Sequence, residues 1–76
     1  STFILRSSDS SDAITDWYQD KLQNLGFSTK TFVKTKQNGN VRNILVVAKE
    51  KTNIAVEIKK NARDTITTIE IRSTST

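Results

Sequence analysis

The chain of 76 residues contains no histidine and no cysteine. Without cysteine there is no disulfide framework, no thiolate nucleophile and no thiolate ligand for zinc. The Ser-His-Asp and Cys-His arrangements are therefore excluded, and the commonest general acid–base residue is missing. An enzyme of this composition would depend on carboxylates or lysine, and none of Glu50, Glu57 and Glu70 lies beside an aromatic cleft motif. The sequence predicts a protein that is not an enzyme, in a domain with little room for a ligand pocket.

Glycine and long apolar runs are also scarce. The two glycines, Gly26 and Gly39, lie outside the P-loop and dinucleotide-binding patterns, which excludes nucleotide binding through those motifs. No run approaches the roughly 18 apolar residues that cross a bilayer, so no membrane-spanning segment is predicted. Apolar residues make up 34% of the chain, which is enough for a thin core in one small domain.

Three aspartates, Asp12, Asp16 and Asp20, recur at every fourth residue. On a helix they form an acidic stripe, and carboxylate oxygens are ligands for calcium. Side chains on a straight helix diverge into water, however, and the spacing of an EF-hand loop is absent. We therefore expect a solvated helix face, with no metal site and no cofactor.

One amphipathic helix is predicted in the first third of the chain. Apolar residues recur at steps of three and four positions, at Ile14, Trp17, Tyr18, Leu22 and Leu25. Lys21 lies at the edge of this apolar face. Ser8 or Asp9 is expected to cap its start, and Gly26 followed by Phe27 predicts a Schellman ending. Trp17 and Tyr18 could stack on a ligand, but core packing is the favoured interpretation, with one of them at the margin.

After Gly26 the period changes to two, which predicts a half-buried strand at residues 27–34. Asn38-Gly39 then predicts a type I′ hairpin leading into a strand at residues 41–49. Residues 44–48 form the longest apolar run, which is typical of a strand inside a sheet or covered on both faces. Further strands are predicted at residues 3–5, 54–59 and 69–72.

These elements predict an α+β fold in which one amphipathic helix packs on a four- to five-stranded, mainly antiparallel sheet. The order is strand, helix, then three or four strands, in a single domain of residues 1–76 with its core at about 3–72 and a polar tail or linker at 73–76. The helix covers one face of the sheet. The open face is expected to carry Lys30, Phe32, Lys34, Glu57, Lys59, Glu70 and Arg72, and a register shift of one residue would invert such an assignment.

The net charge of +4 raises the possibility of nucleic-acid binding. Lys30, Phe32 and Lys34 would form a basic strand with a stacking ring, and Lys36 and Arg42 would extend it. Against this, the charge is modest, lysine predominates over arginine, and there is no RNP motif. Lysine on exposed strands also provides solubility and discourages edge-to-edge pairing. Nucleic-acid binding is the alternative function.

Residues 3–9, the helix pattern Trp17-Tyr18-x-x-x-Leu22 and the ending Leu25-Gly26-Phe27 resemble a type of small domain of bacterial lipoproteins and other exported proteins. In that type a strand leads to the helix, and an antiparallel meander follows. The resemblance implies an extracytoplasmic, non-catalytic domain and provides no functional residues to transfer.

The sequence as a whole predicts a non-enzymatic protein-interaction or structural module of a larger exported or surface protein. The polar ends, Ser1-Thr2 and residues 73–76, are typical of linkers and favour a domain of a longer chain. The expected partner is a protein and the expected location is extracytoplasmic, with the cytoplasm as the alternative. The oligomeric state stays open, because an unpaired edge strand can pair with another chain.

Overall fold

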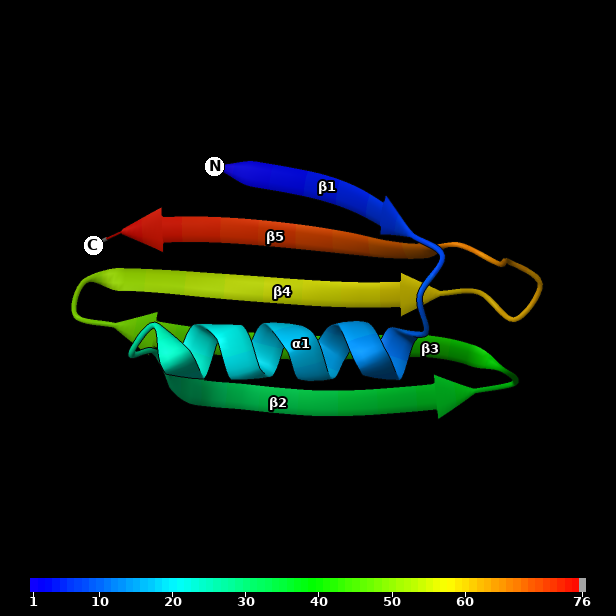
Figure 1. The fold of residues 1–76 in the computed structure, drawn as a ribbon, viewed down its shortest axis with the longest axis horizontal. Helices are drawn as coiled ribbons and strands as arrows, with labels where there is room; N and C mark the ends of the chain where they lie inside the picture. The colour runs from blue at the N-terminus through cyan, green and yellow to red at the C-terminus, as the bar shows by residue number, and fades with distance from the viewer. Residues whose placement is uncertain (76) are drawn as a thin grey trace.

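The computed structural model describes residues 1–75, and it confirms the predicted α+β fold (Figure 1). The elements are β1 (Thr2–Ser7), α1 (Ser11–Asn24), β2 (Ser28–Gln37), β3 (Asn40–Lys49), β4 (Thr52–Lys60) and β5 (Thr67–Ser75). They form a five-stranded sheet in the order β1-β5-β4-β3-β2, and every neighbouring pair is antiparallel. Strands β2 to β5 are therefore the predicted meander, and β1 is added beside β5.

Both ends of α1 are closed by local contacts. At the start, the Ser10 side chain accepts a hydrogen bond of 3.1 Å from the Ala13 N–H, so Ser10 is the cap and the prediction of Ser8 or Asp9 is wrong. At the end, Gly26 has φ +94°, and the Phe27 N–H donates to the Leu22 carbonyl at 3.0 Å, which confirms the Schellman ending. Within residues 1–75 no helix has the length and apolar character required to cross a bilayer.

Helix α1 lies over β2, β3 and β4, and the core lies between these layers (Figure 1). The core residues are Ile14, Leu22, Leu45, Val47, Val56, Ile58 and Ile69. Trp17 is 57% exposed, so its predicted core packing is wrong, and only Tyr18 packs at the margin of the core. The buried face of α1 contains Ile14, Thr15 and Leu22. Because a helix turns by 100° per residue, Trp17 lies on a different side of α1 from this face.

A buried polar contact joins α1 to β3. Asn43 is 2% exposed and Thr15 is 0% exposed, and the Asn43 Nδ2 group donates to Thr15 Oγ1 at 2.9 Å. Thr15 Oγ1 in turn donates to the Ser11 carbonyl at 2.7 Å. Because a buried polar group needs a partner, this pair favours one position of α1 over the sheet.

The β2–β3 hairpin has the predicted turn. Asn38 and Gly39 have φ values of +54° and +82°, as a type I′ turn requires. The turn packs against the β4–β5 loop, where the Ala62 N–H donates to Asn40 Oδ1 at 2.8 Å. A Cβ atom at Gly39 would lie only 2.8 Å from the Ala62 Cβ atom.

Gly39→Ala is therefore expected to lower the free energy of unfolding by about 1–3 kcal/mol, because it adds a left-handed backbone penalty and a steric contact. Urea denaturation followed by circular dichroism measures the change. Adding Ala62→Gly should recover only the steric part of the loss, since the backbone penalty remains. An unchanged midpoint for Gly39→Ala would contradict the prediction.

Candidate functional site

A β-bulge in β2 changes the face of the sheet on which residues predicted for nucleic-acid contact lie. Thr29 pairs with Val47, but Thr31 pairs with Val46, so one extra residue lies between them at Lys30. This extra residue reverses the alternation of side chains in the rest of the strand.

Beyond the bulge, Phe32 pairs with Leu45 and Lys34 pairs with Asn43, and both partners are buried beneath α1. Cross-strand partners share a face of the sheet, so Phe32 and Lys34 lie on the α1 side. The predicted position of these two residues on the open face is wrong. The prediction assumed that side chains alternate regularly along residues 27–34, and the bulge at Lys30 breaks this alternation.

The predicted basic track is consequently interrupted. Lys34 Nζ lies 3.8 Å from Asp12 Oδ1 of α1 and 5.7 Å from the centroid of the Phe32 ring. Lys36 pairs with Val41, and Arg42 pairs with Lys59 on the opposite face. The acidic helix thus stands beside the basic strand, which lowers the attraction of that edge for a phosphate backbone.

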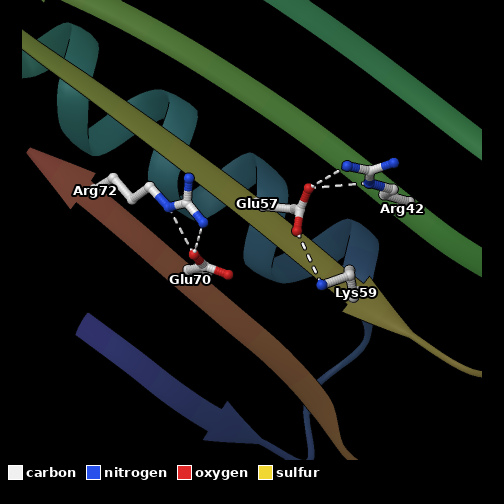
Figure 2. Close-up of polar contacts among 5 residues, drawn as sticks. All are labelled: Arg42, Glu57, Lys59, Glu70 and Arg72. Carbon is white, nitrogen blue, oxygen red and sulfur yellow. Dashed lines mark hydrogen bonds and ion pairs between the residues drawn. The ribbon is translucent and has the colours of Figure 1, made fainter. Parts of the chain in front are cut away.

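The open face carries a group of ion pairs at its centre, and Figure 2 shows them on the side of the sheet away from α1. Arg42 donates to Glu57 Oε2 through Nε at 2.9 Å and Nη2 at 2.7 Å, and Lys59 Nζ lies 3.0 Å from Glu57 Oε1. Arg72 holds Glu70 Oε1 in the same way, at 2.7 Å and 2.6 Å. The predicted open-face positions of Glu57, Lys59, Glu70 and Arg72 are confirmed.

Glu57 and Glu70 are direct cross-strand neighbours, so the structure does bring two carboxylates together. Acid–base catalysis by such a pair requires environments that separate the two pKa values and keep one group protonated. The hydrogen bond from Arg42, followed by the contact with Lys59, instead lowers the pKa of Glu57. Glu57 is ionised at neutral pH and is unsuited to the role of general acid.

The lowered pKa gives a stability prediction with a definite sign. Glu57 stabilises the fold at pH values above its ordinary pKa of 4.5, and this contribution is lost as the pH falls through its folded pKa. Glu57→Gln should therefore lower the free energy of unfolding at neutral pH by up to about 1 kcal/mol, and the difference from wild type should shrink in acid. Denaturation at several pH values tests this, with Glu50→Gln in the β3–β4 turn as the control. A difference that grows in acid would contradict it.

An apolar surface lies at the β1 edge of the sheet, on the same face as α1. The helix covers β2, β3 and β4 but does not extend over β5 and β1 (Figure 1). Phe3 pairs with Ile71 and Leu5 pairs with Ile69, so both β1 side chains lie on the α1 face. Phe3 is 61% exposed, and the 57% exposed Trp17 lines a hollow together with Ile69, the cross-strand partner of Leu5. We call Phe3, Leu5 and Trp17 the β1–α1 surface.

A hollow of about 470 Å³ adjoins this surface, with Ile14 and Ile69 at its base and Trp17 and Tyr18 in its wall. The two rings meet edge to face, with centroids 4.9 Å apart. Burial raises the pKa of Tyr18, so its hydroxyl keeps its proton at neutral pH. The hollow is larger than expected for a domain of this length. The sequence prediction missed it because the partner strand of β1 was unknown.

Metal-ligating groups are sparse in the same region. Across residues 1–75, no three Asp or Glu side chains converge as a set of metal ligands. The stripe of Asp12, Asp16 and Asp20 runs along α1, and Asp12 contacts Lys34 instead.

A family model described as START domain-like matches residues 1–70, which extend from β1 into β5. No curated protein and no solved structure is significantly similar to the chain. Because the matched model spans nearly all of the sequence, the chain belongs to the START domain-like family.

Proposed function

We propose that the domain is a non-enzymatic protein-interaction module that contacts its partner through the β1–α1 surface. The observation that carries the proposal is the gathering of exposed Phe3, Leu5 and Trp17 on one side of the molecule. Contiguous exposed apolar residues are typical of interaction sites. Aromatic residues such as Phe3 and Trp17 are also enriched at the centres of interfaces between proteins.

Two observations make other functions less well supported. The sequence lacks histidine and cysteine, and the one pair of adjacent glutamates is held in ion pairs with arginine and lysine. For nucleic-acid binding, Phe32 and Lys34 lie on one face of the sheet while Arg42 lies on the other. Nucleic-acid binding stays a prediction of the sequence, and so does the catalytic inactivity.

The proposal includes a parent protein that is exported or displayed at a cell surface. Its support is the resemblance of residues 3–27 to domains of exported proteins.

Peptides selected from a random display library against the immobilised domain test the proposed surface. Their affinity should fall at least tenfold on Phe3→Ser and on Trp17→Ser, because each change removes an aromatic contact. Val33→Ser is the matched control, since Val33 is 46% exposed at the opposite edge of the sheet. Equal effects of the three substitutions, or no selected peptide, would overturn the proposal.

The alternative function, nucleic-acid binding, is tested by a separate titration. Single-stranded and duplex oligonucleotides are added at low and moderate salt, and the protein is expected not to bind. Micromolar binding that weakens steeply with salt and on Phe32→Ala would instead support a nucleic-acid domain, because backbone contacts release counterions and stacking needs the ring.

A further inference from the structure

The two free edges of the sheet, β1 and β2, differ in how well they are protected. Strand β2 contains a bulge at Lys30 and two further lysines, Lys34 and Lys36, which are common means of blocking edge-to-edge pairing. Strand β1 has no bulge and no lysine, and its one charged residue is Arg6 near its end. Its central residues are Phe3, Ile4 and Leu5, and Ile4 is 58% exposed.

The hydrogen bonds between β1 and β5 show which backbone groups of β1 are directed outward. Ser1 and Ser73 exchange two bonds, from the Ser1 nitrogen to the Ser73 carbonyl at 3.2 Å and from the Ser73 N–H to the Ser1 carbonyl at 3.0 Å. In an antiparallel pair such exchanges alternate, so Phe3 and Leu5 also bond to β5. The N–H and C=O groups of the intervening residues, Thr2, Ile4 and Arg6, are directed to the free edge.

These outward groups are spaced for pairing with a second β1 strand. With a two-fold axis at Ile4, Ile4 of each copy exchanges both backbone bonds with Ile4 of the other, and Thr2 does so with Arg6. Every outward N–H then meets a carbonyl of the second strand, and all of β1 takes part.

The side chains suit the same register. Phe3 of each copy lies opposite Leu5 of the other on the α1 face, in the closer, non-hydrogen-bonded type of pair. On the open face Ile4 lies opposite itself, and Arg6 lies opposite Thr2, so no two like charges are directly paired. The exposed apolar residues of β1, Phe3, Ile4 and Leu5, thus contact apolar residues of the second copy.

An equivalent pairing centred on β2 is less favourable. Gln37 and Asn40 flank the two-residue turn and are hydrogen-bonded to each other, so the outward backbone groups of β2 belong to Phe32, Lys34 and Lys36. A two-fold axis at Lys34 would place this lysine opposite itself, which is destabilising.

We propose that the partner of β1 is the β1 strand of a second copy of this chain, paired antiparallel about Ile4 so that the two sheets become continuous. This assignment rests on the proposed function, because it names the protein that the β1–α1 surface contacts. The backbone bonds provide the alignment, and the Phe3–Leu5 contacts provide the apolar burial.

Sedimentation equilibrium over a wide concentration range tests the pairing. The mass of the wild type is expected to rise with concentration from 8.6 kDa towards twice that value. Ile4→Lys, which places two charges opposite each other, should weaken dimerisation at least tenfold, whereas Val33→Lys at the other edge should leave it unchanged. Circular dichroism confirms that each variant is folded.

A second measurement tests the register, and it uses the absence of native cysteine. Residues directly opposite each other lie within the Cα separation that a disulfide requires, while Phe3 of one copy and Phe3 of the other lie too far apart. A mixture of Phe3→Cys and Leu5→Cys chains should form the disulfide between the two variants under mild oxidation. This product should be in clear excess over disulfides that join two Phe3→Cys chains or two Leu5→Cys chains.

The outcomes separate this inference from the proposed function. A wild type of constant 8.6 kDa, or a dimer that Ile4→Lys and Val33→Lys affect equally, overturns the pairing. If that monomer still binds the selected peptides through Phe3 and Trp17, the interaction function stands and only the second copy is ruled out. If it binds no peptide, both are overturned. A mixed disulfide no more abundant than the others would also overturn the register.

Discussion

Ile58→Ala is expected to lower the free energy of unfolding by about 2–5 kcal/mol. Ile58 is 0% exposed and lies in β4 directly between Asn43 of β3 and Ile69 of β5. Truncation there leaves a cavity that the neighbouring strands cannot close, because their backbones are held by ladder hydrogen bonds on both sides. At roughly 0.05–0.15 kcal/mol per residue, a domain of this length has only about 4–11 kcal/mol in total, so a large share of it would be lost.

Urea denaturation monitored by far-UV circular dichroism measures this loss. Ile66→Ala is the matched control, since Ile66 is 41% exposed in the segment before β5. Its free energy of unfolding should change by less than about 0.5 kcal/mol. Similar shifts for the two variants would show that the core is not centred on β4.

Thr15→Val should cost about 1–3 kcal/mol although it preserves the shape of the side chain. The substitution removes the acceptor of the Asn43 Nδ2 group at a site that water does not reach, so that donor is left without a partner. It also removes the bond from Thr15 Oγ1 to the Ser11 carbonyl. Chemical denaturation of the variant gives the cost directly.

The combination of Thr15→Val with Asn43→Leu separates the lost hydrogen bond from the unpaired donor. Replacing both polar partners by apolar groups of similar shape removes the unsatisfied amide, so the double variant should be destabilised by less than the sum of the single variants. Strict additivity would indicate that the two side chains do not interact in solution.

Features governed by local backbone chemistry could be predicted from the sequence. Gly26 ends α1, and Asn38-Gly39 forms the hairpin turn, because positive φ values restrict the residue type at the position itself. The apolar alternation of β4 likewise placed Glu57 and Lys59 on the open face correctly.

Features that depend on distant partners could not be predicted. The bulge at Lys30 exists only in the register between β2 and β3, and no residue in its neighbourhood marks it. The exposure of Trp17 depends on how far α1 reaches across the sheet, and there Thr15 and Asn43 occupy the central contact in place of a larger apolar residue. The β1–α1 surface was missed for a related reason, since it requires the knowledge that β1 joins β5.

The pairing of β1 with β5 also has a consequence for the order in which the molecule forms during synthesis. Among the strands of residues 1–75, β1 has β5 as its only neighbour, and Phe3 pairs with a residue 68 positions further along the chain, Ile71. Contacts of such sequence separation form late, because the intervening chain must be closed first. On the ribosome, Phe3, Ile4 and Leu5 therefore have no sheet neighbour until the β5 segment has emerged, and this is the period in which the nascent chain is most exposed to association with other chains.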